Sequence, residues 1–281
     1  MIVYLNGALL PKDEAHVSPD DRGFLFADGA YEVVRGYDGR LFRLHDHLQR
    51  LRRSLREIDI DPPDLDVLAA AARELVRRNG LLEGDSALYF QVTRGVAPRK
   101  HVFPPAGTPP TVYMTASPLQ PAPDKWEKGV AVILVPDIRW TRCDVKSLML
   151  LPSVLASQQA RERGAEEAIF VRDGFVTEGA HTNFCAVLDG TLLTHPANNH
   201  ILDGITRRLV LDLCADLGIP TRLMPIPVDQ LPSAAEMLIL GTTTEIKPVI
   251  QVDDWQVANG RPGPITRQLQ AAFRALTTSA P

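Results

Sequence analysis

The chain has 281 residues, of which 45% are hydrophobic and 23% charged, and its formal net charge is -4. This balance is typical of a soluble globular protein with enough material for one large or two medium-sized domains. The small negative charge gives no reason to expect nucleic acid or an anionic membrane as a partner. The start of the chain lacks the basic and apolar regions of a signal peptide, and no segment approaches the roughly 20 apolar residues of a membrane span. We therefore expect a cytoplasmic protein.

The three cysteines, Cys143, Cys185 and Cys214, are widely spaced and odd in number. No Cys-x-x-Cys pair is present, and the histidines lack the spacing of helical metal ligands. The sequence therefore predicts reduced, buried thiols and no metal site.

The N-terminal half alternates strand and helix patterns, and Asn-Gly or Asp-Gly turns separate them. Its predicted elements are strands at 1–5, 30–37, 87–96 and 111–116, and helices at 44–58 and 64–78. A proline-rich stretch without periodicity, 117–124, then predicts a linker. We expect a small N-terminal domain at 1–116 and a larger domain at 125–281.

Four side chains of the predicted strand at 30–37 share one face, because side chains alternate along a strand. These are Tyr31, Val33, Arg35 and Tyr37. A tyrosine and an arginine on one face are able to bind an anion. Taken alone, the same pair also fits a tyrosine at a sheet edge with an arginine lying across it.

Two further cationic sites stand out in this half. Arg50 lies beside the apolar stripe of its predicted helix, so its side chain can reach inward. In the loop at 97–105, prolines stiffen the backbone around Arg99 and His101, which favours a binding role over a merely solvated charged loop.

The C-terminal half is also mixed. Its predicted elements are strands at 130–135, 168–171 and 236–240, a hairpin over 183–193, and helices at 153–163, 205–217 and 264–276. Helix and strand patterns in both halves predict an α+β (mixed α/β) protein.

Lys146 is the only lysine or arginine between Cys143 and Ala160, and apolar residues follow it closely. Desolvation disfavours the ammonium form of a lysine and frees the amine as a nucleophile. Schiff-base chemistry with a carbonyl cofactor needs such an amine. A surface lysine beside a buried strand is the alternative.

Two segments are suited to an anion. Gly204, Ile205 and Thr206 stand at the start of a predicted helix, where free N–H groups and the helix dipole attract phosphate. Thr242 and Thr243 follow a predicted strand and offer hydroxyls and amides. A simple N-cap and a polar turn are the alternatives. Neither segment matches a Walker or dinucleotide fingerprint, which argues against nucleoside triphosphates and NAD.

Glu178 precedes a glycine at the end of a predicted strand. A carboxylate in this position can point into a cleft, and opposite a pyridine nitrogen it would keep the ring protonated. A surface glutamate near a turn is the alternative.

In their order along the chain and in their residues, these segments resemble the class IV (fold type IV) pyridoxal-phosphate aminotransferases, and most closely the bacterial D-amino acid transaminases. The resemblance covers nearly the whole chain. It rests on Asp21–Gly23, Asp28–Val34, Tyr89–Gly95, Pro98–His101, Asp137–Leu148, Thr177–Gly179, Thr194–Asn199, Gly204–Arg207 and Thr242–Glu245.

The resemblance implies a small N-terminal α/β domain and a larger C-terminal domain with a mixed barrel-like sheet. It also implies a role for each candidate site residue. Lys146 would form the Schiff base with pyridoxal 5'-phosphate and then move the substrate Cα proton. Glu178 would face the pyridine nitrogen. The other implied cofactor-binding residues are Arg50, Leu202, Gly204, Ile205, Thr206, Thr242 and Thr243. The implied substrate-binding residues are Tyr31, Val33, Arg35, Arg99 and His101.

The implied reaction is a ping-pong exchange between a D-amino acid (D-alanine, D-glutamate) and a 2-oxo acid (2-oxoglutarate, pyruvate). In this family the loop carrying Arg99 and His101 reaches in from the neighbouring subunit. The resemblance therefore implies a homodimer with the active site near the subunit interface.

The chain departs from the D-specific pattern in two places. Ala180–Thr182 replace a serine-rich run after Glu178, which changes the hydrogen bonding expected near the cofactor. Arg35 stands where lysine is common, and we expect its forked guanidinium to help bind dicarboxylic substrates.

Other functions remain open at this point. The same fold serves branched-chain L-amino acid transaminases, (R)-selective amine transaminases and 4-amino-4-deoxychorismate lyase. A non-catalytic protein that binds a phosphorylated ligand is the alternative from another class.

Overall fold

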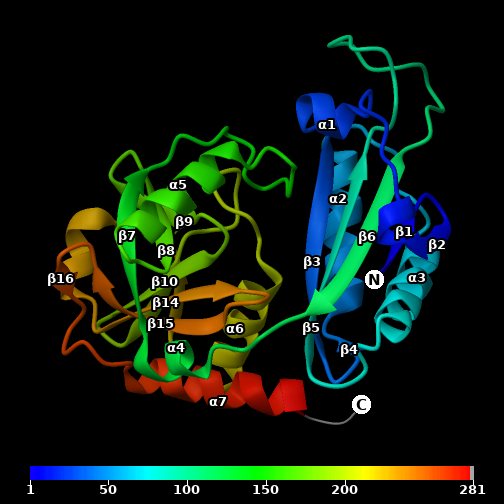
Figure 1. Cartoon of the computed structure of the whole chain (residues 1–281). Helices are drawn as coiled ribbons and strands as arrows, with labels where there is room; N and C mark the ends of the chain where they lie inside the picture. The colour runs from blue at the N-terminus through cyan, green and yellow to red at the C-terminus, as the bar shows by residue number, and fades with distance from the viewer. Residues whose placement is uncertain (279–281) are drawn as a thin grey trace. The chain divides into compact units, whose positions relative to one another are not determined.

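The computed structural model describes residues 1–278, and the chain divides into two compact units (Figure 1). Unit 1 is Met1–Pro121 with Val145–Met149, and unit 2 is Ala122–Asp144 with Leu150–Pro281. The short segment that carries Lys146 therefore groups with unit 1, whereas the sequence-based limits place it in the C-terminal domain.

An antiparallel sheet forms the frame of unit 1. Within residues 1–121 its strands, in spatial order, are β2 (Ala8–Pro11), β1 (Ile2–Leu5), β6 (Thr111–Pro118), β5 (Asp85–Thr93), β3 (Gly29–Tyr37) and β4 (Arg40–Leu41). Strands β3 and β5 pair without a break, so that Tyr31 lies opposite Gln91 and Arg35 opposite Ala87. This register sets the positions of the predicted substrate-binding side chains.

Two helices, α2 (Leu44–Arg56) and α3 (Leu65–Arg78), pack on this sheet. Leu48, Leu51 and Leu55 of α2 are buried in one continuous core, as the spacing of the leucines predicts. Burial of three leucines contributes several kcal/mol, at roughly 1.5–3 kcal/mol each. The Asp64 carboxylate caps α3 by accepting the first free N–H groups of the helix.

The sequence predicts only turns around residues 20–29, but a five-residue helix, α1 (Arg22–Phe26), lies there. The Asp21 side chain caps its start, and Ala27 ends it in the left-handed region, at a φ of 55°. A 3-10 helix, η1 (Lys12–Glu14), follows β2.

A mixed sheet forms the frame of unit 2. In the part described, up to residue 278, its order is β12 (Thr221–Leu223), β11 (Thr191–Thr194), β10 (Asn183–Leu188), β14 (Glu236–Gly241), β15 (Glu245–Val252), β7 (Val130–Pro136), β8 (Glu167–Arg172), β9 (Phe175–Gly179) and β13 (Ile226–Pro227), and β16 (Trp255–Gln256) pairs with β15. Strands β15, β7 and β8 run parallel, as do β11 and β12. Strands β9 and β10, although well separated in this order, contact each other, so the sheet curls. The predicted mixed α/β class with a barrel-like second sheet is confirmed.

Helices pack against this sheet and against one another. Helix α5 (Leu151–Glu162) packs on β7 and β8, and α4 (Pro123–Lys128) contacts β15. Helix α6 (Ile205–Asp216) contacts β14 and the terminal helix α7 (Pro264–Thr278). A 3-10 helix, η2 (Val228–Ser233), precedes β14. The cysteines are buried, as predicted.

Among residues 1–278, no helix combines the length and the apolar character needed to cross a bilayer.

Candidate active site

The backbone around Lys146 lies beside the start of β3. Tyr31 donates its N–H to the carbonyl of Lys146 at 3.0 Å, and Leu148 donates to the carbonyl of Gly29 at the same distance. The Lys146 N–H in turn donates to the Ser54 hydroxyl on α2 at 3.2 Å. The lysine is therefore attached by its backbone to both a strand and a helix of unit 1.

The side chain of Lys146 is half-buried and lies against Tyr31. Its Nζ is 3.3 Å from the Tyr31 hydroxyl and 4.3 Å from the centre of the ring. The ring excludes water from one side of the amine. Its π-electron face also attracts the amine when the amine is protonated. This arrangement suits an amine that has to be held in place before it reacts.

Arg50, a predicted phosphate ligand, belongs to a buried cluster in unit 1. Its Nε and Nη2 donate to the Glu32 carboxylate at 2.6 and 2.8 Å, and His47 Nδ1 lies 2.7 Å from the same carboxylate. Burial alone would raise the pKa of Glu32, but Arg50 and His47 outweigh it and lower the pKa to about 2. The Glu32 carboxylate is therefore a fixed negative partner of the Arg50 guanidinium. The role of Arg50 in phosphate binding remains a prediction.

The predicted substrate-binding face of β3 differs from position to position. Val33 is half-buried, whereas Arg35 is 2% exposed and forms an ion pair with Asp85 at 2.5 Å. The Arg35 guanidinium also lies over the Tyr37 ring, 4.7 Å from its centre. Arg35 thus already has a carboxylate partner in its own unit, and its role toward a substrate carboxylate remains a prediction.

Arg99 and His101 are exposed and lie near one aromatic side chain, Phe26 of α1. The Arg99 guanidinium is 5.2 Å from the centre of the Phe26 ring, and the His101 ring is 5.6 Å from it. The structure therefore brings together, beside Phe26, the two side chains that the sequence singles out in this loop.

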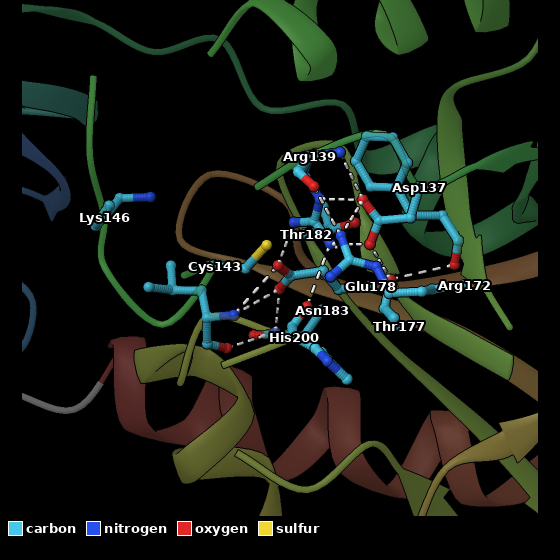
Figure 2. A network of polar contacts seen from close by, with 12 residues as sticks. Asp137, Arg139, Cys143, Lys146, Arg172, Thr177, Glu178, Thr182, Asn183 and His200 are labelled. Carbon is cyan, nitrogen blue, oxygen red and sulfur yellow. Dashed lines mark hydrogen bonds and ion pairs between the residues drawn. The ribbon is translucent and has the colours of Figure 1, made fainter. Parts of the chain in front are cut away.

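Glu178, in unit 2, is 5% exposed and stands at the centre of a network of polar contacts (Figure 2). Its carboxylate accepts hydrogen bonds from Arg139 Nη1 at 2.6 Å and from Asn183 Nδ2 at 2.9 Å. The backbone N–H of Leu202 adds a third donor at 3.1 Å. These donors orient the carboxylate and stabilise its ionised form.

Arg139 owes its position to a second buried carboxylate, Asp137. The two side chains form a forked pair, with both distances 2.9 Å, and Arg172 and Thr177 also bind Asp137. Burial alone would raise the pKa of Asp137, but the hydrogen bonds and charge of Arg139 outweigh it and lower the pKa. Because Asp137 stays ionised, it holds the arginine that reaches Glu178.

The start of α6 leaves room for an anion. Gly204 caps the helix without a side-chain hydrogen bond, and the first turn, which lies within the described chain, has no acidic residue. The N–H groups of Ile205 and Thr206 form the positive end of the helix dipole, and the carboxylate of Asp203, just before Gly204, is paired with Arg207 and Arg208. A Cβ at Gly204 would meet Asn183 Oδ1 at 1.9 Å, so only glycine allows this close approach.

The second predicted anion segment, with Thr242 and Thr243, lies in the turn between β14 and β15. Leu240, just before it, pairs with Asn183 on β10. A Cβ at Gly241 would lie 3.5 Å from the Thr182 side chain. The residues just before Thr242 and the start of α6 therefore both lie next to Thr182 or Asn183, where β10 begins.

Ala180–Thr182, the departure from the D-specific pattern, form the turn between β9 and β10. Thr182 Oγ1 donates to Glu167 at 2.9 Å, and His181 Nδ1 lies 3.0 Å from the same carboxylate. In the described structure, the bonds to the Glu178 carboxylate given above come from outside this turn.

Sequence reasoning missed four side chains that the structure joins to the predicted residues: Glu32, His47, Arg139 and Asn183. Glu32 follows Tyr31 and lies on the opposite face of the strand. The spacing of three between His47 and Arg50 was a usable signal, because such residues are neighbours on a helix. The contact of Asn183 with Leu202 had no local signal.

Residues 29–252 match the family described as amino-transferase class IV. The chain belongs to this family. It is 43% identical over 272 residues to a D-alanine aminotransferase of Staphylococcus haemolyticus (96% of each chain) and 42% identical over 275 residues to one of Bacillus licheniformis (98% of this chain, 96% of the relative).

Solved structures agree with the family assignment. The branched-chain amino acid aminotransferase from Escherichia coli matches with a TM-score of 0.88 and 30% identity, over 99% of this chain and 94% of that one. A branched-chain enzyme from T.th. with pyridoxamine 5'-phosphate matches with a TM-score of 0.90 and 27% identity over the same shares. The predicted family and fold are thus confirmed.

Class IV aminotransferases use pyridoxal 5'-phosphate, so this chain is a pyridoxal-phosphate-dependent aminotransferase. Its residues fit that cofactor at three points. Lys146 offers an amine beside Tyr31, Glu178 offers a fixed carboxylate for a ring nitrogen, and Gly204 opens a helix whose N–H groups suit a phosphate.

Proposed function

We propose that the protein is a D-amino acid transaminase, which exchanges the amino group between D-alanine or D-glutamate and 2-oxoglutarate or pyruvate. The observation that carries this proposal is the 42–43% identity, over 96% of the chain, to relatives named D-alanine aminotransferase. The structural neighbours named as branched-chain enzymes are 27–30% identical.

We propose Lys146 as the catalytic base. When bound, pyridoxal 5'-phosphate supplies a carbonyl carbon for the substrate amine and a ring that withdraws electrons. Lys146 Nζ would take the proton from the substrate Cα and deliver it to the C4′ carbon of the bound cofactor. The Tyr31 hydroxyl, 3.3 Å from Nζ, orients the amine for this transfer.

The residues assigned to the cofactor contact either its ring or its phosphate group. Glu178 keeps a proton on the ring nitrogen, supported by the donors that fix its carboxylate. The N–H groups of Ile205 and Thr206 bind the phosphate, with Thr242, Thr243 and Arg50 as further ligands. Leu202 packs against the ring.

Arg99, His101 and Tyr31 bind the substrate α-carboxylate, with Val33 lining the same face of β3. Arginine suits this role because its planar fork matches a carboxylate. Arg35 is assigned to substrates with a second carboxylate.

The active enzyme is a homodimer in which the loop carrying Arg99 and His101 serves the neighbouring subunit. Support comes from apolar side chains near this loop: Phe24, Val102 and Phe103 are 77%, 71% and 56% exposed. Apolar surface of this kind marks a site of protein association.

The test is a half-reaction followed by absorbance. Purified holoenzyme is mixed with D-alanine and, separately, with L-alanine and L-leucine. Loss of the cofactor's visible band with D-alanine alone supports the proposal. Loss with L-leucine alone would keep the family and overturn the assignment of Tyr31, Arg99 and His101 to a D-substrate.

Two alternatives within the family are tested in the same assay. The structural neighbours named as branched-chain enzymes favour L-leucine as the second substrate to try. (R)-1-phenylethylamine, which has no carboxylate, tests for (R)-selective amine transfer.

A further inference from the structure

Asp28, in the link between α1 and β3, binds two arginines at once. Its Oδ2 lies 2.7 Å from Arg22 Nε and 2.8 Å from Arg94 Nε, and its Oδ1 accepts from Arg94 Nη2 at 2.9 Å. The arginine side chains are only 4% and 9% exposed, and that of Asp28 is 12% exposed. One carboxylate thus neutralises two buried cations, which without it would repel each other in a poorly hydrated place.

Both arginines bind the loop that joins β5 to β6. Arg22 Nη1 donates to the carbonyl of Lys100 at 2.6 Å, between the two predicted carboxylate-binding residues, and contacts the carbonyl of Val102 at 3.4 Å. The Arg94 guanidinium lies 3.7 Å from the centre of the Phe103 ring. Each arginine therefore connects Asp28 to one part of the loop.

Arg94 is also anchored to the body of unit 1. Its Nη1 and Nη2 donate to the carbonyls of Asp59 and Ile58, just beyond the end of α2, at 2.7 and 2.6 Å. The loop is thus tied, through Arg94 and Phe103, to a rigid part of the fold.

The base of the loop is closed by backbone contacts. Gly95 has a φ of 90°, and a Cβ there would meet the carbonyl of Pro109 at 2.0 Å, so the two ends of the loop touch. Beyond this base the loop extends past β5 and β6 (Figure 1), and its residues from 98 to 103 are exposed. Without the two arginines, the part of the loop that carries Arg99 and His101 would lose these side-chain supports.

We propose that Asp28 is a positioning residue for substrate binding: by holding Arg22 and Arg94, it fixes the loop in the conformation in which Arg99 and His101 receive the substrate carboxylate. This inference rests on the proposed role of Arg99 and His101. It predicts that Asp28 acts on the affinity for carboxylates although it touches neither substrate nor cofactor.

The experiment compares Asp28→Asn with Glu74→Gln in the holoenzyme. Glu74 is a matched control, because its carboxylate also binds two arginines, Arg77 and Arg78, but on the exposed surface of α3. The measured quantities are KM and kcat for D-alanine and the inhibition constant of propionate, which has a carboxylate and no amino group.

We expect Asp28→Asn to raise KM and the propionate inhibition constant about tenfold, as loss of a hydrogen bond to a charged group implies, with a smaller effect on kcat. Glu74→Gln should match the wild type. Trypsin provides a direct readout of the loop: cleavage after Arg99 and Lys100 should become faster in Asp28→Asn and stay unchanged in the control.

Arg99→Ala separates the two proposals. If Arg99→Ala raises KM and Asp28→Asn does not, the positioning role is overturned and the proposed function stands. If Arg99→Ala leaves KM unchanged, the carboxylate-binding assignment fails, and the inference fails with it. The double variant should show less than additive effects, because both changes act through the same contact.

Should Asp28→Asn fail to fold, Phe103→Ala replaces it. The Phe103 side chain is 56% exposed, so its loss leaves the core intact while removing the contact with Arg94. Because Phe103 also belongs to the proposed dimer surface, Val102→Ala is its control: Val102 is 71% exposed in the same surface and contacts Arg22 only through its backbone carbonyl. Faster tryptic cleavage with a raised KM supports the positioning role, and wild-type values for both contradict it.

Discussion

The amine of Lys146 lies 3.3 Å from the hydroxyl of Tyr31, and the backbones of the same two residues share a hydrogen bond of 3.0 Å. Two residues 115 positions apart in the chain are therefore joined at both main chain and side chain. A change at either residue alters the position of the other, so their variants have to be interpreted together.

Lys146→Ala removes the proposed base. We expect turnover to fall by a factor of about 10³ or more, because positioned proton transfer contributes roughly 10²–10⁴-fold and the lysine also anchors the cofactor. The variant should still bind pyridoxal 5'-phosphate through the phosphate contacts, which equilibrium dialysis measures. Turnover within tenfold of the wild type would contradict the assignment.

Tyr31→Phe keeps the ring beside Lys146 and removes only the hydroxyl. We expect kcat for D-alanine to fall by up to about tenfold, as the loss of one hydrogen bond worth roughly 0.5–1.5 kcal/mol implies. The unfolding midpoint should stay near that of the wild type, because the ring remains. Tyr89→Phe is the control, since the Tyr89 ring is 5.7 Å from that of Tyr31 and its hydroxyl binds Gln91 instead.

Arg139→Gln breaks a pair of buried ionic contacts. It leaves Asp137 and Glu178 without their shared arginine, and removing one partner of a buried pair costs about 3–5 kcal/mol. We expect a lower urea midpoint together with slower turnover at saturating cofactor, because Glu178 loses the shortest of its described hydrogen bonds. Arg142→Gln, at a half-exposed ion pair with Asp144, should change neither value by much.

Gly204→Ala introduces a Cβ that would meet Asn183 Oδ1 at 1.9 Å. Asn183 or the start of α6 has to move, and we expect the dissociation constant of pyridoxal 5'-phosphate to rise at least tenfold. Gly218→Ala is the control at the other end of the helix. With a φ of 67° and open space for a Cβ, it should lower stability but leave cofactor affinity unchanged.

Acid should destabilise unit 1 through Glu32. The folded-state pKa of Glu32, about 2, lies below its ordinary value of 4.5, so its contribution is present above about pH 4.5 and is lost as the pH falls toward 2. The difference corresponds to the order of 3 kcal/mol. Burial also lowers the pKa of His47, which adds to the loss of stability below its ordinary value of 6.5.

Urea midpoints between pH 7 and pH 3 test this prediction. Glu32→Gln should be less stable than the wild type at pH 7, because it leaves Arg50 buried without its carboxylate, and its midpoint should depend less on pH. Glu83→Gln, an exposed position, should follow the wild-type curve. Equal pH dependence in all three proteins would exclude Glu32 as the source.

Local patterns predicted most of the secondary structure. The leucine spacing of α2 and the glycine before α6 are signals within one turn of a helix, and both elements lie where expected. Helix α1 was missed because five residues are too short to show a helical period. The domain limits at 116 and 125 remain a proposal.

The site was predicted only as far as local signals reach. The lysine, the glutamate before Gly179 and the two anion segments can be recognised from a few adjacent residues. The partners of Arg35 and Arg50 depend on strand register and on helix packing over distant parts of the chain. For this reason the sequence suggested an anionic ligand for each of the two arginines, and the structure pairs them with Asp85 and Glu32.

Asn183 contacts two candidate site segments that are separate in the sequence, Glu178 and the start of α6. Its Nδ2 binds both Glu178 and the carbonyl of Leu202, and its Oδ1 faces Gly204 at the start of α6. One amide is thus tied both to the carboxylate proposed for the cofactor ring and to the helix start proposed for its phosphate. We therefore expect a change at Asn183 to disturb both proposed cofactor contacts in a single step.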